Sequence, residues 1–309
     1  MPYALQSPLL TGGTACDLVT PFAENGELDR VGLMALVEWQ ILSGISAIAV
    51  CGEPGEAATL SREERAAVIR IAVEAAERQV PVIAGTGTNA TASTITLTAD
   101  AKALGADAAM IVTPYYSKPT QEGILHHFEA VAAAVDIPIV ICNAPGRSAC
   151  DLSPRTLERL AAIPSVVGLQ DCTGDIGRLV RMPRAVRERL VHYSGHDLTA
   201  LAFNLSGGAG SISAAANVAP RLVCAMHHAL RTGNVDAALA LGERLGPLLQ
   251  VLEKEPGPAA IKHAVHLVHG IGSRVRLPLT SISPDTAAAI RMALAPLPEC
   301  SERRRKQAV

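Results

Sequence analysis

The chain alternates between short apolar runs and longer segments whose apolar residues recur at helical spacing. Short runs of this kind, bounded by turn-forming residues, predict buried β-strands. Eight of them occupy residues 14–20, 47–51, 81–84, 108–112, 138–142, 166–170, 190–194 and 210–213. Strands that alternate with helices along the whole chain predict parallel βα units.

Helix-start signals lie between several of the predicted strands. Ser61 followed by Glu64 forms a capping box, in which the two side chains satisfy unpaired backbone donors reciprocally. Ser153 precedes Pro154, a proline at a first helical position, where its missing N–H costs nothing. Weaker caps are predicted at Asp29 and Thr120.

Eight βα units in one uninterrupted run favour an α/β fold, a closed (β/α)8 TIM barrel. A doubly wound sheet is the alternative, but it would be favoured by a GxGxxG turn, which Gly12-Gly13 does not provide. Helical periodicity continues at residues 220–231, 235–253, 259–269 and 284–294. We therefore predict one domain, with the barrel in residues 1–219 and a C-terminal helical extension in residues 220–309 that ends in a basic tail. These additional helices are expected to pack against the barrel or to form a subunit contact.

Composition narrows the class of protein. Apolar residues make up 49% of the chain and aromatic residues 3%, which is typical of a parallel sheet wrapped by helices. The net charge of −2, with both signs interspersed, predicts no nucleic-acid partner, and the basic run at residues 303–306 is expected to be a solvated tail. Without a signal-peptide pattern or a long apolar stretch, we expect a cytoplasmic protein with no membrane partner. The seven cysteines form no CxxC pair, so neither a zinc site nor a disulfide framework is indicated. No cofactor is expected.

Barrels of this class carry their functional groups at the C-terminal ends of the strands and in the loops that follow. Topology alone therefore selects a set of candidate side chains: Thr20, Glu53, Thr86, Tyr115, Tyr116, Cys142, Asn143, Arg147, Gln170, Asp171, His196, Asp197 and Ser213.

Several motifs at these strand ends occur in one order along the chain. They are Val19-Thr20-Pro21-Phe22, Gly52-x-x-Gly55-Glu56, Ala84-Gly85-Thr86-Gly87, Pro114-Tyr115-Tyr116, Pro119-x-Gln121-Glu122-Gly123, Asn143-x-Pro145-x-Arg147, Gly168-x-x-Asp171-x-x-Gly174 and Ser194-Gly195-x-Asp197. Together they resemble the dihydrodipicolinate synthase/N-acetylneuraminate lyase family over nearly the whole chain. The resemblance implies a homo-oligomer, a tetramer or a dimer, and lyase chemistry on a small carboxylate such as pyruvate or another 2-keto acid.

The resemblance also identifies a missing group. Members of this family form an imine between a lysine at the end of the sixth strand and the keto carbon of pyruvate. The matching position is Gln170. An amide nitrogen cannot form a Schiff base, because its lone pair is delocalised into the carbonyl group. The lysines at 102, 118, 254, 262 and 306 fall in predicted helices, loops or the tail. We therefore expect the imine chemistry to be absent and no other lysine to lie at the mouth of the barrel.

Further departures from the family surround this position. Two threonines that hold the substrate carboxylate in the family are replaced by Glu53 and Pro54. A proline offers no N–H, and a carboxylate about 4 Å from another costs on the order of 4 kcal/mol at an effective dielectric of 20. Cys142 stands where a tyrosine of the family's proton relay is expected. Tyr116 matches the other relay tyrosine, which typically reaches across a subunit contact. Arg147, which binds a carboxylate in the synthases, is retained.

Each predicted role has an alternative. Glu53 is expected to act as a general acid or base with a pKa raised by burial, or else to pair with Arg147. Gln170 is expected to polarise a substrate oxygen, or else only to fill the volume of the lysine. A Cys142–His196 nucleophile pair is disfavoured, because buried thiols are common and nothing in the sequence indicates a lowered thiol pKa. A divalent-metal site is disfavoured, because no HxH or HExxH spacing supports it. The predicted catalytic residues are Glu53, Tyr116 and Gln170, and the predicted substrate-binding residues are Cys142, Asn143, Arg147 and Ser213.

Three functions follow from these residues. In the main hypothesis, a family member binds a small keto or hydroxy acid and uses acid/base chemistry without an imine. In the second, a non-catalytic relative keeps the barrel for ligand binding or assembly. In the third, the synthase or pyruvate-lyase activity of the family persists by another route.

Overall fold

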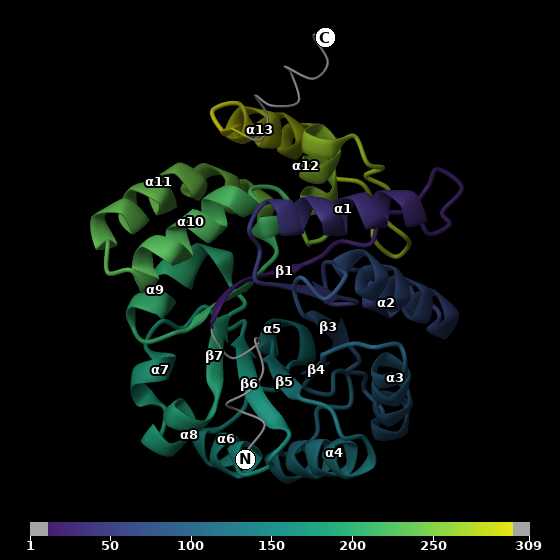
Figure 1. The fold of residues 1–309 in the computed structure, drawn as a ribbon, viewed down its shortest axis with the longest axis vertical. Coiled ribbons are helices and arrows are strands. Elements are labelled where there is room, and N and C mark those ends of the chain that lie inside the picture. Colours follow the sequence, from purple (N-terminus) through teal and green to yellow (C-terminus); the bar gives the residue numbers. More distant parts are fainter. Residues whose placement is uncertain (1–11, 299–309) are drawn as a thin grey trace.

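Eight parallel strands form a closed barrel in the computed structural model, which describes residues 12–298 (Figure 1). Each strand pairs with its neighbour in sequence, and β1 closes the barrel against β8. The strands are β1 (Gly13–Asp17), β2 (Ala47–Val50), β3 (Val82–Gly85), β4 (Ala108–Val112), β5 (Ile139–Asn143), β6 (Val166–Asp171), β7 (Val191–Ser194) and β8 (Gly210–Ser213). The (β/α)8 barrel expected from the sequence is confirmed.

The largest boundary difference from the predicted strands is at the end of β1. The sequence predicts a strand to residue 20, whereas β1 ends at Asp17. Beyond it, the Val19 N–H donates to the Asn217 side chain at 2.9 Å instead of joining the barrel ladder. The chain therefore leaves the sheet at the point where the first functional loop begins.

Helices surround the barrel in chain order. They are α1 (Arg30–Leu42), α2 (Arg62–Ala76), α3 (Thr91–Ala103), α4 (Gln121–Ala134), α5 (Pro145–Ser148), α6 (Pro154–Ala161), α7 (Arg178–Arg181), α8 (Arg184–Arg189), α9 (Ala200–Leu205), α10 (Pro220–Arg231), α11 (Val235–Leu252), α12 (Ala259–His269) and α13 (Pro284–Leu294). Among the described helices, none combines the length and apolar character that crossing a bilayer requires.

Side-chain caps start several of these helices as the sequence predicts. The capping box at Ser61 and Glu64 is present at the start of α2. Ser153 caps α6 ahead of Pro154 by accepting a hydrogen bond from the Thr156 N–H. The weaker candidates, Asp29 and Thr120, also accept a backbone N–H at the starts of α1 and α4.

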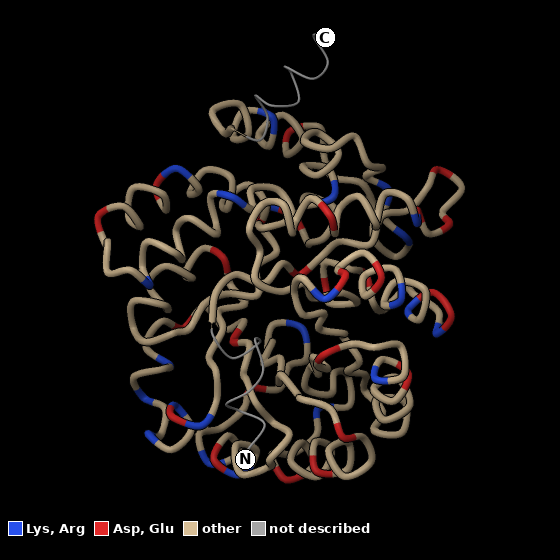
Figure 2. The backbone as a smooth tube through the Cα atoms, viewed as in Figure 1, with Lys and Arg blue, Asp and Glu red and all other residues tan. Residues whose placement is uncertain are grey.

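The barrel interior and the helix layer have separate apolar cores. The interior is filled mostly by small or branched side chains, among them Ala15, Ala49 and Val140. Two larger clusters fill the space between the sheet and the helices, and Phe128 and Leu33 are among their fully buried members. On the outside, Lys and Arg alternate with Asp and Glu over the helices, as Figure 2 shows.

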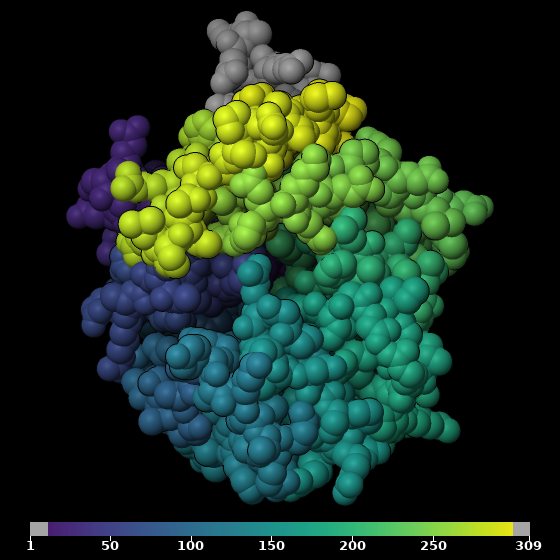
Figure 3. All heavy atoms as spheres, turned by 180° about the vertical axis from the view of Figure 1, so that it is seen from behind, coloured from purple at the N-terminus to yellow at the C-terminus, as the bar shows by residue number. Residues whose placement is uncertain are grey.

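The C-terminal helices lie along one side of the barrel. The helix α10 packs on β1 and beside α11, and α12 and α13 follow (Figure 1). The face seen in Figure 3 is hollowed where these green and yellow helices meet the teal part of the barrel. Residues 253–258, between α11 and α12, line this hollow together with strand ends. The division at residue 219 stays a prediction, and the basic run at 303–306 lies outside the described residues.

Candidate active site

A cavity of about 940 Å³ opens at the C-terminal ends of the strands. Strand ends and their loops supply most of its wall, and the segment between α11 and α12 supplies the rest. The polar or sulfur-bearing residues that matter for its chemistry are Asp17, Cys51, Glu53, Met110, Cys142, Arg147, Gln170, Cys172, His196, Asp197, Glu253 and Lys254. The position of this cavity agrees with the place where barrels of this class bind their ligands.

The cavity brings together four of the seven predicted site residues: Glu53, Cys142, Arg147 and Gln170. The other three are not among the described residues that line it. Tyr116 is 93% exposed, with a left-handed backbone at φ 69°. Ser213 is buried beside the cavity, and its hydroxyl donates to Asp197 at 2.6 Å. The roles predicted for these residues stay predictions.

Glu53 and Arg147 form an ion pair across the mouth. The Arg147 Nη2 donates to the Glu53 Oε1 at 2.7 Å, and the two side chains remain 56% and 44% exposed. Packing of the surrounding chain raises the pKa of Glu53, whereas the positive charge of Arg147 opposes that shift. A pair this exposed contributes no more than about 1 kcal/mol, because water screens both charges. The structure therefore contains the alternative arrangement considered for Glu53, in a pair weak enough for a ligand to separate.

Gln170 lies at the end of β6 on the floor of the cavity. Its side chain is 3% exposed, and the Nε2 makes one long hydrogen bond of 3.4 Å to the Ile212 carbonyl. Its Oε1 has no hydrogen-bond partner among the described residues. Gly195 packs closely here, since a Cβ at that position would lie 3.0 Å from the Nε2. A buried amide with unused bonding capacity is suited to holding a ligand oxygen or hydroxyl group.

Asp17 at the end of β1 is a buried carboxylate on the cavity wall that the sequence analysis did not select. Burial raises its pKa well above the ordinary range, and the nearby charges of Glu53 and Asp197 raise it further. Gly52 is required beside it, because a Cβ there would lie 2.1 Å from the Asp17 Oδ1. The signal that could have identified Asp17 is its position at the end of the first strand. The predicted strand extended three residues further, to residue 20, so Asp17 was not selected as a strand-end residue.

His196 connects the loop after β7 to the C-terminal helices. Its Nδ1 lies 2.9 Å from the Thr199 hydroxyl, and its Nε2 lies 3.6 Å from a carboxylate oxygen of Glu253. Burial raises the pKa of Glu253 and of the neighbouring Asp197. Glu253 had no signal in the sequence, because a residue at the end of a C-terminal helix is placed at the barrel mouth only by packing.

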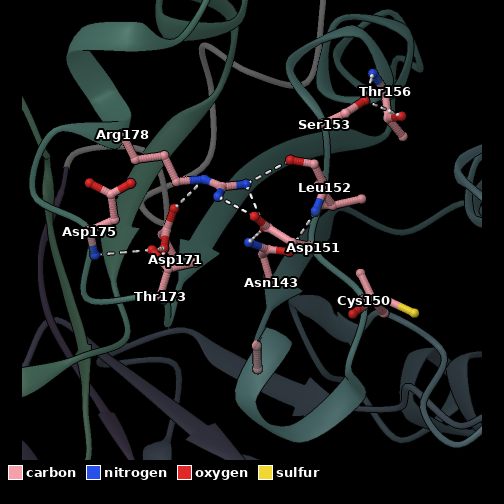
Figure 4. A network of polar contacts seen from close by, with 12 residues as sticks. Asn143, Cys150, Asp151, Leu152, Ser153, Thr156, Asp171, Thr173, Asp175 and Arg178 are labelled. Carbon is pink, nitrogen blue, oxygen red and sulfur yellow. Dashed lines mark hydrogen bonds and ion pairs between the residues drawn. The ribbon is translucent and has the colours of Figure 1, made fainter. Parts of the chain in front are cut away.

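Asn143 belongs to a different network, on the outer face of the sheet (Figure 4). Its Nδ2 donates to Asp151 at 2.8 Å, and its Oδ1 accepts from the Leu152 N–H at 3.2 Å. Arg178 lies 2.8 Å from both the Asp151 and the Asp171 carboxylates. With its side chain bonded in this way and no exposed surface, Asn143 braces the strand end behind the cavity.

The expectation that no lysine lies at the mouth is wrong. Lys254 lies two residues after the end of α11, is exposed and lines the cavity. Its position depends on how the C-terminal helices pack, which its place in the sequence does not reveal. Lys262 is buried instead, with its Nζ 2.5 Å from a carboxylate oxygen of Glu56 and 2.8 Å from the Arg274 carbonyl. Burial lowers the pKa of Lys262 to about 8.

Both the sequence and the fold of this chain match those of known proteins. A model of the dihydrodipicolinate synthetase family matches residues 11–296. The chain belongs to this family. It is 48% identical over 282 residues to 4-hydroxy-tetrahydrodipicolinate synthase of Methylococcus capsulatus, covering 91% of this chain and 97% of the relative. It is 43% identical over 285 residues to the synthase of Pseudomonas aeruginosa, covering 92% and 98%.

Solved structures of the family have the same fold. Dihydrodipicolinate synthase of Acinetobacter baumannii, complexed with pyruvate, superimposes with a TM-score of 0.90 at 41% identity, covering 92% of this chain and 98% of that one. A monomeric dihydrodipicolinate synthase variant superimposes with a TM-score of 0.91 at 34% identity, covering 95% and 98%. The family resemblance and the barrel fold deduced from the sequence are both confirmed.

Proposed function

We propose that this family member binds pyruvate or a similar small 2-keto acid in the cavity at the mouth of its barrel. Its similarity to 4-hydroxy-tetrahydrodipicolinate synthases and to a synthase complexed with pyruvate supports this ligand class. The observation that carries the proposal is the set of polar groups around one cavity: the Gln170 amide on the floor, and the separable Arg147–Glu53 pair at the rim.

The first route does not use an imine. A ligand carboxylate competes with Glu53 for the guanidinium of Arg147, which offers bidentate recognition. Glu53, released from the pair, takes a proton from the carbon next to the keto group. The Gln170 amide donates a hydrogen bond to the keto oxygen, where negative charge develops as the enolate forms. Polarisation of the same oxygen by Tyr116 would require a second copy of the chain, since its side chain is 93% exposed and does not line the described cavity.

The second route keeps the synthase activity of the relatives. The similarity to synthases supports this route better than the first, since the relatives are 42–48% identical and share that activity in their names. The presence of Lys254 on the cavity wall gives it a chemical basis, because an amine there is able to add to a keto carbon. A non-catalytic binding subunit remains the third candidate, and a test for turnover separates it from both.

Reductive trapping separates the two routes. The protein is incubated with pyruvate and borohydride, and its mass is compared with that of Lys254→Arg and of the surface control Lys102→Arg. An unchanged mass supports the first route. An adduct that disappears only in Lys254→Arg supports the second route and rules out the first.

Deuterium exchange tests proton transfer without a second substrate. Pyruvate in heavy water is followed by proton NMR, which reports loss of the methyl signal as the enolate forms. We expect exchange with the wild-type protein and at least about a hundredfold slower exchange with Glu53→Gln, because general-base catalysis contributes about 10²–10⁴-fold. The control is Glu188→Gln, an exposed residue of α8. No exchange, together with a thermal shift on adding pyruvate, identifies a binding subunit instead.

We also propose that the chain forms a homo-oligomer, with a dimer or a tetramer as the candidate states. The exposed Tyr116 and other exposed apolar side chains, such as Val180 at 68%, support a covered surface. Light scattering on the wild type and on Tyr116→Ala tests this assembly. A monomeric mass at micromolar concentration overturns it, and the monomeric variant among the structural relatives shows that this outcome occurs in the family.

A further inference from the structure

Sulfur-bearing side chains are concentrated on the floor of the cavity. Cys51, Met110, Cys142 and Cys172 all line it. The Sγ atoms of Cys142 and Cys172 lie 4.0 Å apart. Both are free thiols and both are partly exposed. The proton-transfer route described above uses neither of these two thiols, so the pair requires a separate account.

Strand geometry explains why these thiols meet. Cys142 on β5 is the register partner of Gln170 on β6, and Cys172 follows Gln170 by two residues. Residues two apart in a strand direction face the same side, so both sulfurs point into the barrel. Gly195 restricts the space around Cys172, since a Cβ at that position would lie 2.4 Å from the Cys172 Sγ. The two sulfurs therefore lie next to each other on the cavity wall, close to the Gln170 side chain.

The separation suits a bridging ion better than a disulfide bond. A disulfide requires a sulfur–sulfur distance of about 2.05 Å, so the two atoms would have to approach by about 2 Å. On an ideal sheet, residues in this diagonal relation have α-carbons about 8 Å apart, beyond the upper limit of about 6.8 Å usual for disulfides. By contrast, two metal–thiolate bonds of about 2.3 Å to one ion would span 4.0 Å at an angle of roughly 120°.

The chemistry of the donors selects the class of ion. Thiolate and thioether sulfurs are soft ligands, which favour Cu(I) over hard cations such as Mg²⁺. Within residues 12–298, no group of three or more His, Cys, Asp or Glu is arranged to hold a metal. That finding argues against a four-ligand zinc site made by the described part of the chain. Two thiols with the Met110 thioether on the same wall suit a monovalent ion of low coordination number.

We infer that Cys142 and Cys172 bind a soft monovalent metal ion of the Cu(I) class on the cavity floor, beside Gln170. The step is a ligand exchange: two S–H bonds break, two metal–sulfur bonds form and two protons leave to solvent, with no change in oxidation state. The hydrogen-bonded Cys142 and burial raise the pKa of Cys172 well above its ordinary value. The ion therefore has to displace thiol protons, as thiolate-bound metals generally do.

Silver(I) is a suitable probe because it is soft, monovalent and stable toward oxidation. The reduced full-length protein is loaded with Ag(I) without oxygen, washed with a weak competing thiol and weighed by native mass spectrometry. We expect one retained ion per chain. Cys142→Ser and Cys172→Ser should each lose it, whereas Cys150→Ser, a buried cysteine outside the cavity, should retain it. When each variant competes with a colorimetric chelator for Cu(I), the variants should show the same order of metal retention.

Two further measurements keep the test decisive. Circular dichroism and the alanine variants Cys142→Ala and Cys172→Ala separate loss of the ligand from loss of the fold. Equal metal retention by a variant that combines Cys142→Ala and Cys172→Ala and by the Cys150→Ser control overturns the proposal, as does rapid formation of a Cys142–Cys172 disulfide under mild oxidation. Pyruvate binding is measured separately on the metal-free wild-type protein, so failure of the metal site and failure of the keto-acid site remain distinguishable.

Discussion

The ends of β5 and β6 carry two polar regions that differ by one residue in each strand. On the outer face, Asn143 and Asp171 belong to a network in which Arg178 connects two carboxylates. On the inner face, Cys142 and Gln170 share the register of the same strands, but the Gln170 amide makes only one long hydrogen bond among the described residues. The outer region is organised for stability. The inner region leaves bonding capacity for a ligand.

The two regions also differ in their relation to the family. The outer residues match the motifs that carry the resemblance, whereas Gln170, Cys142 and Glu53 depart from what it implies. A chain is able to change the chemistry inside its barrel while keeping the supports behind it, because alternate residues of a strand face opposite sides. Substitutions on the two faces should therefore separate stability from ligand binding.

The largest effect on stability is expected from Arg178→Met. It leaves the Asp171 carboxylate, which is 3% exposed, without the cation 2.8 Å away. Removing one partner of a buried pair costs about 3–5 kcal/mol. Urea denaturation measures the change in the free energy of unfolding. The control Arg181→Met, from an exposed pair with Asp175, should cost less than about 1 kcal/mol. If both variants lose the same free energy of unfolding, the outer network of Arg178 does not have the stabilising role assigned to it here.

The next largest effect is a gain of stability, expected on replacing the carboxylate of Asp17 on the inner face. Because burial raises its folded-state pKa, the folded protein holds a proton that the unfolded chain releases above pH 3.8. Stability contributed by this group is therefore lost as the pH rises beyond 3.8. At pH 7, Asp17→Asn should increase the free energy of unfolding by on the order of 1 kcal/mol or more and so raise the melting temperature. This increase in stability should vanish near pH 3.5. The same measurements on Asp236→Asn, at an exposed position of α11, serve as the surface control.

Gln170→Leu removes the polar group of the inner face. Since the Gln170 amide has one long bond, its loss should change the free energy of unfolding by less than about 1 kcal/mol. A matched buried residue is Gln40, whose Nε2 donates to the Ala216 carbonyl at 2.8 Å. Gln40→Leu should cost about 1–3 kcal/mol. Calorimetry should show pyruvate binding lost in Gln170→Leu and kept in Gln40→Leu; the reverse pattern would make Gln170 a packing residue.

The smallest effect on stability is expected from Glu53→Gln. The ion pair with Arg147 is exposed, so the free energy of unfolding should change by no more than about 1 kcal/mol. Pyruvate affinity should rise, because the guanidinium of Arg147 no longer has a competing carboxylate. Urea denaturation measures the change in the free energy of unfolding, and titration calorimetry at low and high salt measures the change in pyruvate affinity. An affinity that falls instead would show that Glu53 assists binding directly.

Much of the molecule could be predicted from local patterns. The strands and helices followed from apolar periodicity, and the caps at Ser61 and Ser153 followed from hydrogen-bond chemistry within a few residues. Four of the predicted site residues line the cavity at the mouth, because the strand ends of a barrel converge. Asn143 was harder to assign, since the direction of a side chain at the last strand residue depends on register.

The sequence by itself determined the barrel, its family and the absence of an amine at position 170, because periodicity, motif order and residue identity are local properties of the chain. Only the tertiary structure decided that Lys254 and Glu253 reach the cavity, that Arg147 pairs with Glu53, and that the thiols of Cys142 and Cys172 lie 4.0 Å apart. These contacts join residues that are distant in the chain. Their geometry depends on how helices and loops pack, which no short stretch of sequence specifies.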